Sequence, residues 1–479
     1  MNTRLITRLG LSTLICLSYS VLFLADFAFA KNSATGCGSL LSQKALKGAL
    51  VRNAYLTPYL SDTLKSLENM RGDNALLADT IWLEPEDGGP LKVSVLNPDT
   101  SPTNIAVDLL VQAEIGNVGE IESILATLNR LPFHQPSGLF FSRYSTDITS
   151  SVRDRDVSSI DNLHLAIALW TIKENYPATQ FGAQAKRLFE RMDFQIFYDR
   201  PSGLIGGNLH FENVDGGVWR KEKYNFDNFG SEARLLYSVG AALGLFHKEQ
   251  NNKYFFERAV SALKIELVRT QQGDLLRLWD GSAFQLLFPK IFAGEENYSK
   301  QFRSMYQNYA NYIIAEGERR DLPLPAGHSA GRVSKEEYRD KSGLTGLVSI
   351  QNNDLSDANL SRNWSGTVHI YAIFMTMTST PEKLKSVLQK TEAIESGPNR
   401  LYAPGHGFMD GLHVEGPSAG EVVPAQLSLN QGMIALSILQ LQAQDGMSAS
   451  TRSLMKNPRV KKSLVQFYKL FDEKIGAEF

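Results

Sequence analysis

The chain has 479 residues, with 49 basic and 51 acidic side chains and a formal net charge of −2 at pH 7. This near balance, without a long run of like charge, argues against nucleic acid as a partner. The length is sufficient to bury one large apolar core or two.

The first thirty residues have the pattern of a secretory signal peptide. Arg4 and Arg8 precede an apolar run over 11–24, and Ala28 and Ala30 are small residues of the kind that signal peptidase requires. The run is short for the ~20 residues that a membrane-spanning helix needs. We therefore expect residues 1–30 to be removed by cleavage after Ala30. The mature protein would be periplasmic or secreted and would have no transmembrane segment.

The sequence contains two cysteines, and cleavage after residue 30 would remove Cys16. Only Cys37 would then remain, so no internal disulfide is expected. Small residues precede Cys37, but Lys31 and Asn32 separate it from the apolar run. Lipid attachment at Cys37 is therefore the weaker alternative.

Beyond residue 30, apolar residues recur mainly at helical spacing. Ser101 and Pro102 have the pattern of a helix N-cap followed by proline in the first turn. Loops rich in Gly or Asn separate the apolar stripes, as is typical of helical hairpins, and no alternation of strands and helices indicates a doubly wound sheet. Comparable stripes lie near 39–70, 118–130, 159–175, 180–194, 228–247, 252–268, 296–316, 364–378, 381–395, 422–441 and 450–475.

These patterns predict an all-α fold with a few short β-strands in the loops, near 92–96 and 203–220. No Pro- or Ser-rich linker divides the chain beyond the signal peptide. We expect residues 31–75 to form an N-terminal helical segment and residues 76–479 to form one domain. The segment 320–362 is rich in Gly, Asp, Asn and Ser, and such long loops are often functional.

Two carboxylates stand near predicted helix starts. Asp161 follows Ser158, which has the pattern of a cap, so its side chain would face the exposed amides of a first helical turn. Taken alone, Asp161 is more simply explained as a complement to the helix dipole. Glu232 lies five residues after Asp227, and an exposed helical carboxylate paired with a basic residue is an equally good interpretation.

A glycine-dense loop over 402–413 contains His406, Asp410 and His413. Glycines allow a backbone to approach a ligand closely. A metal site is conceivable, but no further ligand is clustered with these three residues. We therefore expect hydrogen-bonded histidines in a structured turn, with no metal and no other cofactor.

Signatures of nucleotide binding, metalloproteases and serine hydrolases are absent from the sequence. Trp279, Asp280, Gln285 and Trp364 are aromatic and polar residues of the kinds that line sugar subsites. A buried tryptophan that only fills the core is the commoner case. None of these residues identifies a function by itself.

Six segments, taken together, resemble in order and approximate spacing the glucoamylase-like domain of cyclic β-1,2-glucan synthases and endo-β-1,2-glucanases. The resemblance covers about residues 76–441. The family patterns are T-S-P-T-N-I, V-S-x-x-D-x-x-N-L, S-E-A-R-L, W-S-G-x-M-F-E, Y-G-F-x-D/E and H-Q-G-M or D-Q-G-P. The matching segments are Thr100–Ile105, Val157–Leu163, Ser231–Leu235, Leu278–Gln285, Leu401–Leu412 and Asn430–Met433.

The resemblance implies that 76–479 is an (α/α)6-type barrel of helical hairpins around a glycan cleft. It implies a glycoside hydrolase that cleaves a β-1,2-glucan-like β-glucan or an exopolysaccharide, with inversion and endo action. Such cleavage needs one protonated acid and one ionised group that activates water. Glu232 is expected to be the acid and Asp161 the base, with Asp410 and Asp156 as alternates. The residues expected to bind substrate are Asp156, Trp279, Asp280, Gln285, Trp364, Tyr402, His406, Phe408, Asn430 and Gln431.

Three positions depart from the family pattern. Asn430 stands where relatives carry Asp or His, Gln285 stands where Glu is common, and His164 stands where glucanases place another acid. An amide cannot exchange a proton at useful pH. Two alternatives therefore stay open: a glucan transglycosylase, and a non-catalytic glycan-binding factor in a polysaccharide synthesis or export complex.

Overall fold

A computed structural model describes residues 52–85, 91–212, 217–246, 252–339, 343–350 and 366–478. Arg52–Phe479 is one compact unit. The predicted signal peptide, Cys37 and Trp364 lie outside the described residues. Within the described part of the chain, no helix is both long and apolar enough to cross a membrane.

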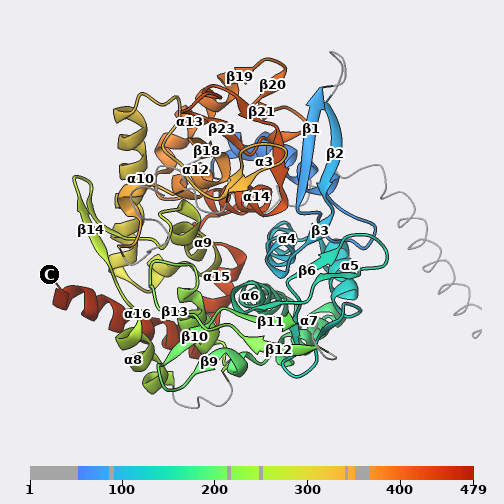
Figure 1. The fold of residues 1–479 in the computed structure, drawn as a ribbon, viewed down its shortest axis with the longest axis vertical. Coiled ribbons are helices and arrows are strands. Elements are labelled where there is room, and N and C mark those ends of the chain that lie inside the picture. Colours follow the sequence, from blue (N-terminus) through green and yellow to red (C-terminus); the bar gives the residue numbers. More distant parts are fainter. Residues whose placement is uncertain are drawn as a thin grey trace, which may run out of the picture. The chain divides into compact units, whose positions relative to one another are not determined.

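Six helical segments form the centre of this unit, and most of their side chains are buried. Neighbours in contact are α4 with α6 and α14, α14 with α12, α12 with α9, and α6 with the π-helix η4. Arg234, just before η4, donates to two carbonyls of α9 and thereby completes a ring of neighbours. Figure 1 shows α4, α6, α9, α12 and α14 around the middle of the unit. The six segments are α4 (Pro102–Ile115), α6 (Ser159–Asn175), η4 (Leu236–Gly240), α9 (Ala283–Ala293), α12 (Ile370–Met377) and α14 (Ser428–Gln442).

One close approach within the ring depends on a glycine. A Cβ atom at Gly432 of α14 would lie only 2.0 Å from Cγ1 of Val107 in α4. A larger residue would force the two helices apart, because packed interiors leave no room for an added methyl group. The glycine of the Asn430–Met433 segment therefore serves helix packing.

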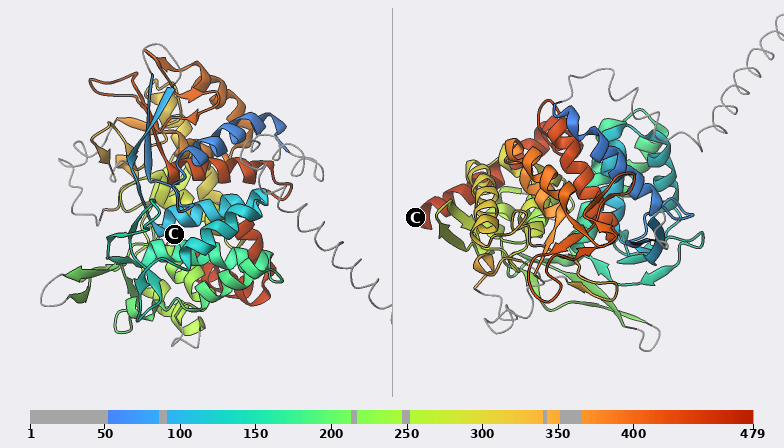
Figure 2. Two further views of the ribbon diagram at one scale, coloured as in Figure 1. Left: turned by 90° about the vertical axis from the view of Figure 1, so that its right-hand side faces the viewer. Right: turned by 90° about the horizontal axis from the view of Figure 1, so that it is seen from above.

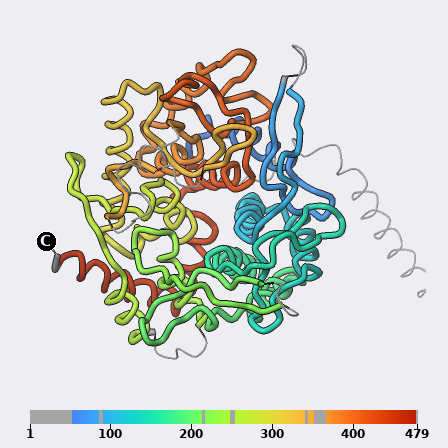
Figure 3. The backbone as a smooth tube through the Cα atoms, in the orientation of Figure 1, coloured from blue at the N-terminus to red at the C-terminus, as the bar shows by residue number. Residues whose placement is uncertain are grey.

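A second set of helices surrounds the ring. Helix α3, early in the described part of the chain, contacts α14, which lies late in the sequence; in the colours of Figure 3, blue tube therefore lies beside orange-red tube. Most of these helices bury one face, as expected for amphipathic helices. They are α3 (Thr57–Asn69), α5 (Val118–Leu128), α7 (Gln180–Glu190), α8 (Asn252–Ala262), α10 (Lys300–Arg319), α13 (Pro381–Ala393), α15 (Ala449–Lys456) and α16 (Pro458–Glu478).

Short antiparallel strands gather on one side of the helices, as Figure 2 shows. Several lead directly into inner helices, so this side carries the N-terminal ends of the ring. In the first half of the chain the strands are β1 (Thr80–Pro85), β2 (Leu91–Asn97), β3 (Asp99–Thr100), β4 (Phe133–His134), β5 (Leu139–Phe140), β6 (Arg143–Ser145), β7 (Val152–Asp154), β8 (Val157–Ser158), β9 (Tyr198–Asp199), β10 (Leu204–Gly206), β11 (Asn208–Glu212), β12 (Val218–Lys221) and β13 (Asn225–Phe226).

The second half of the chain adds further strands, and the sheets of the described residues have two or three strands each. The β1 strand pairs with both β2 and β25, which joins the hairpin before α4 to the entry of α14. The strands are β14 (Leu267–Thr270), β15 (Gly273–Leu276), β16 (Gly331–Arg332), β17 (Tyr338–Arg339), β18 (Thr367–His369), β19 (Glu395–Ser396), β20 (Asn399–Arg400), β21 (Tyr402–Ala403), β22 (Gly407–Phe408), β23 (Gly411–His413), β24 (Val422–Val423) and β25 (Ala425–Leu427).

The structure confirms a mainly helical fold with short strands, including those expected near 92–96 and 203–220. Strands are more numerous than predicted, because the apolar stripes near 364–378 and 422–441 each combine strand residues with the helix that follows them. The predicted regular helix over 228–247 is wrong, since this segment contains a turn and the π-helix η4. Inner helix α9 was not predicted: its residues are buried on nearly every side and it contains Pro289.

Candidate active site

Asp161 lies in the first turn of α6, as predicted. Ser158 is the N-cap, and its side chain accepts a hydrogen bond of 3.2 Å from the Asp161 backbone N–H. Thr103, in the first turn of the neighbouring helix α4, donates its hydroxyl to Asp161 Oδ1. The Asp161 side chain is partly exposed. Two adjacent inner helices therefore fix this carboxylate at the side of the ring where the strands gather.

Glu232 lies in the turn before η4, and it shares a site with Asp161. Burial raises the pKa of Glu232, and the nearby charge of Asp161 raises it further, whereas a hydrogen bond from Ser231 and the charge of Arg234 act in the opposite direction. The Ser231 hydroxyl donates to Glu232 Oε2 over 3.0 Å. A carboxyl group with a raised pKa retains its proton to a higher pH, which is the property that a general acid requires.

Arg234 anchors the turn that contains Glu232 to α9 and to Glu295. Its guanidinium is fully buried and donates to the carbonyl oxygens of Ser231, Gln285 and Leu286. It also forms an ion pair of 2.8 Å with Glu295, which is equally buried. Within the Ser231–Leu235 motif, the arginine therefore anchors the turn to α9, and the glutamate faces the site.

The β11–β12 hairpin and the loop after it bring further polar groups to this region. His210 Nδ1 lies 2.5 Å from Asp156 Oδ2, and its Nε2 lies 3.2 Å from Glu222 Oε1. Hydrogen bonds to Asp156 and Glu222 raise the pKa of His210. Asp156 thus ties β11 to the loop before α6.

Tyr224 is an aromatic residue of the site that the sequence did not single out. Its ring is 47% exposed. Burial of the phenol raises its pKa, and the charges of Glu222 and Glu232 contribute in the same direction. An exposed tyrosine beside the paired carboxyl groups is suited to stacking on a sugar. No local motif marks this position in the sequence.

Asp410 belongs to a second polar group, around α12 and α14. It is 2% exposed. Asn430 donates to its Oδ1 over 2.5 Å, and the backbone N–H of Arg332 donates to its Oδ2 over 2.7 Å. His369 Nδ1 lies 3.4 Å from the same Oδ2. Both oxygens are thus occupied, and Asn430 acts as an amide donor to this carboxylate.

Asp280 and Gln285 support each other at the start of α9. The Gln285 side chain accepts from the Asp280 backbone N–H over 3.1 Å, and Asp280 Oδ1 accepts from the N–H of Ser282 over 2.8 Å. The neighbouring Trp279 is partly exposed. The amide of Gln285 is therefore used to shape the turn.

Four residues of the 402–431 region are buried in the packing of the fold or lie close to α3. The Tyr402 hydroxyl donates to Asp62 of α3 over 2.6 Å. Phe408 is fully buried, and its carbonyl accepts from the buried Gln431 side chain over 2.7 Å. His406 is partly exposed, and burial together with Lys65 of α3 lowers its pKa. The contacts of these four residues are with α3 and within the 402–431 region itself.

The three residues weighed as metal ligands are not clustered. His413 is bonded to Thr367 and to the carbonyl of Val333. Across the described ranges, no group of three or more His, Cys, Asp or Glu side chains has the geometry to hold a metal ion.

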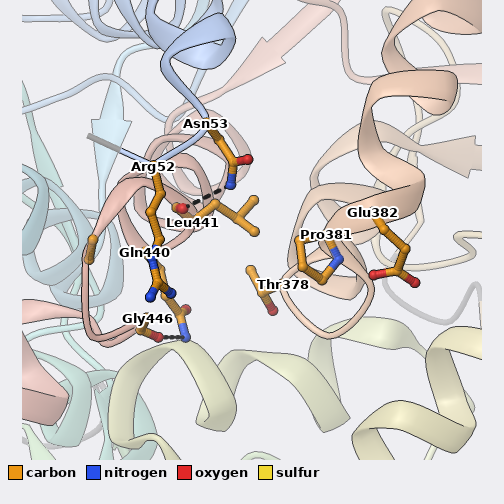
Figure 4. Close-up of a pocket in the computed structure, with 9 residues that line it drawn as sticks. Arg52, Asn53, Thr378, Pro381, Glu382, Gln440, Leu441 and Gly446 are labelled. Carbon is orange, nitrogen blue, oxygen red and sulfur yellow. Dashed lines mark hydrogen bonds between the residues drawn. The ribbon is translucent and has the colours of Figure 1, made fainter. Parts of the chain in front are cut away.

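A pocket of about 540 Å³ lies at the other end of the ring, past the C-terminal ends of α12 and α14. Figure 4 shows Thr378, Pro381 and Glu382 on one side and Asn53, Gln440 and Leu441 on the other. None of the predicted site residues lines it. The paired carboxyl groups are at the opposite, strand-bearing end, so this pocket is separate from the candidate active site.

Comparison with solved structures extends over most of the chain. The endo-β-1,2-glucanase of Chitinophaga pinensis, in complex with sophorotriose and glucose, superposes with a TM-score of 0.65 at 12% identity, covering 88% of this chain and 98% of that one. The endo-β-1,2-glucanase of Talaromyces funiculosus with sophorose gives 0.64 at 14% identity, covering 89% of each chain. The chain has the glucoamylase-like fold of these proteins.

A putative glucoamylase from Bacteroides caccae has the same glucoamylase-like fold, with a TM-score of 0.62 at 14% identity over 86% of this chain and 97% of that one. No protein-family model matches the sequence, and no curated protein matches it. The likeness therefore lies in the arrangement of the helices, as the resemblance of the six segments predicted.

Proposed function

We propose that this protein is a glycoside hydrolase that cleaves a β-glucan of the β-1,2-linked type. Glu232 is the general acid that protonates the leaving oxygen, and Asp161 is the base that activates water. The observation that supports the proposal is their shared site at the starts of neighbouring inner helices, where burial and the charge of Asp161 raise the pKa of Glu232. The fold shared with two endo-β-1,2-glucanases supports the substrate class.

The closed ring of inner helices, with other helices around it, supports an (α/α)6 barrel. We further propose that the enzyme acts in the periplasm, with the signal sequence removed, and that it cleaves within the chain with inversion. Asp156, Trp279, Asp280 and Tyr224 are placed to contact the glycan or to shape its site. The buried Asp410 is better suited to supporting the site than to proton transfer.

The test is incubation of the purified protein with linear and cyclic β-glucans of defined linkage, following new reducing ends. Glu232→Gln and Asp161→Asn should each reduce the rate by at least about 10³-fold while glucan binding is retained, since both are required for acid and base catalysis. Asp227→Asn is the matched control, because Asp227 pairs with Lys264 at the surface over 2.7 Å. It should retain activity.

Product analysis separates the proposal from its alternatives. Inversion predicts that NMR first detects the α-anomer at the new reducing end of a β-glucan. Products longer than the substrate would instead indicate a transglycosylase. Tight glucan binding with no new reducing ends, unchanged by Glu232→Gln, would contradict hydrolysis and favour a binding protein.

A further inference from the structure

A buried hydrogen-bond chain lies behind Asp161 and links it to a histidine. The Thr103 hydroxyl donates to Asp161 Oδ1, and Thr103 Oγ1 lies 2.9 Å from His164 Nδ1. Thr103 is 5% exposed and His164 is 2% exposed. His164 is one turn along α6 from Asp161, so both side chains reach the same threonine of α4.

The role proposed for Asp161 determines where the protons lie. As the proposed base, Asp161 is a carboxylate that only accepts hydrogen bonds, so the single hydroxyl proton of Thr103 points to Asp161. Thr103 Oγ1 is then an acceptor, and His164 must carry its proton on Nδ1. Burial lowers the pKa of His164 to about 3, so the ring is neutral at ordinary pH.

The other ring nitrogen of His164 is unusual. Within the described part of the chain, Nε2 is buried and has no hydrogen-bond partner. The imidazole packs against Phe288 and Phe292 of α9, with ring centroids 4.4 and 5.4 Å away. A buried unsatisfied nitrogen is costly, and a leucine would fill the same space without that cost. The contact with Thr103 is the interaction that offsets it.

We propose that Thr103 and His164 are positioning residues that aim the Asp161 carboxylate through the chain Nδ1–H···Oγ1–H···Oδ1. The chain occupies Oδ1 and leaves Oδ2, which has no hydrogen bond to any described residue, to receive the water that attacks the glycan. Among the described residues, Thr103 and Ser158 form hydrogen bonds with Asp161, and Glu232 is a titratable group that interacts with it. This inference rests on the proposed function, because it assigns Asp161 the role of base.

Pairs of variants separate the hydrogen bond from the space that each side chain fills. Thr103→Val has nearly the same shape without the hydroxyl, and it should reduce kcat by about 10–100-fold with KM changed by less than about threefold. Thr103→Ser restores the hydroxyl and should retain activity to within about threefold. A Val variant as active as the Ser variant would overturn the proposal.

His164 is tested in the same way. His164→Asn retains an N–H near the position of Nδ1, whereas His164→Leu removes it and keeps the apolar contact with α9. The Asn variant should be at least about fivefold more active than the Leu variant, with kcat and not KM carrying the difference. Equal activities would contradict the chain, because a purely structural histidine favours the apolar replacement.

A spectroscopic measurement makes the inference independent of hydrolysis. In protein labelled with ¹⁵N-histidine, the His164 signals, assigned by their loss in His164→Asn, should show a neutral ring protonated on Nδ1 from pH 5 to 8. Thr103→Val should shift the Nδ1 signal. A ring protonated on Nε2 overturns the positioning chain even if glucan is cleaved. If the His164 ring has the expected form but the protein cleaves no glucan, the result would instead refute the proposed function.

Discussion

Breaking the buried ion pair of Arg234 and Glu295 should be one of the most destabilising single changes in the protein. The Glu295 carboxylate accepts hydrogen bonds from Arg234 Nε over 3.0 Å and from a terminal guanidinium nitrogen over 2.8 Å. It also accepts hydrogen bonds from the hydroxyls of Tyr306 and Tyr468. Both charged side chains are fully buried. Glu295→Gln keeps the volume but leaves the guanidinium without a counter-charge. Breaking a buried pair in this way costs about 3–5 kcal/mol.

Urea unfolding followed by circular dichroism measures this loss as a lower midpoint at constant slope. The control is Glu190→Gln, which makes the same chemical change in the exposed pair of Lys186 and Glu190 at 3.1 Å on α7. Exposed helical pairs contribute about 0.3–0.5 kcal/mol. If Glu295→Gln costs less than about 1 kcal/mol, the argument that Arg234 depends on this carboxylate is refuted.

Three further changes test the site and the ring. Activity should fall as pH rises through the elevated pKa of Glu232, because the acid must be protonated. Ser231→Ala removes a hydrogen bond that favours the ionised form of Glu232. In a kcat/KM profile, this variant should therefore move the decline to higher pH. Asn430→Asp places a second carboxyl group beside Asp410, so the melting temperature should fall at pH 8 and recover near pH 5 as one carboxyl takes up a proton. Gly432→Ala crowds α4 and should cost about 1–3 kcal/mol in urea unfolding, and an unchanged midpoint would show that the helices separate freely.

Local sequence signals predicted local structure well. The structure confirms the Ser101 cap, the proline after it and the place of Asp161 in the first turn of α6, because each depends on neighbouring residues. Helix α9 was missed for a physical reason. A segment buried on nearly every side has no polar face and therefore no periodic pattern, and Pro289 further resembles a helix end.

Long-range partners could not be predicted in the same way. Thr103 and His164 meet across 61 residues, and neither one stands in a pattern that specifies the other. The aromatic and glycine-rich residues over 402–408 resembled a sugar subsite, but Tyr402 and Phe408 pack against Tyr59 of α3. The sequence shows residue types suited to a ligand, whereas only the packing of distant helices decides which of them a ligand can reach.

The π-helix that follows Glu232 affects the orientation of the Glu232 carboxyl group. The π-helix η4 covers Leu236–Gly240, and a π-helical turn holds one more residue than an α-helical turn. Each residue advances an α-helix by about 100° around its axis. Losing one residue within η4 would therefore rotate Glu232 away from Asp161 and would also move Arg234 away from its buried partner Glu295. The angle at which the proposed acid faces Asp161 is thus encoded in the number of residues within η4, and the same residues set the position of the buried Arg234.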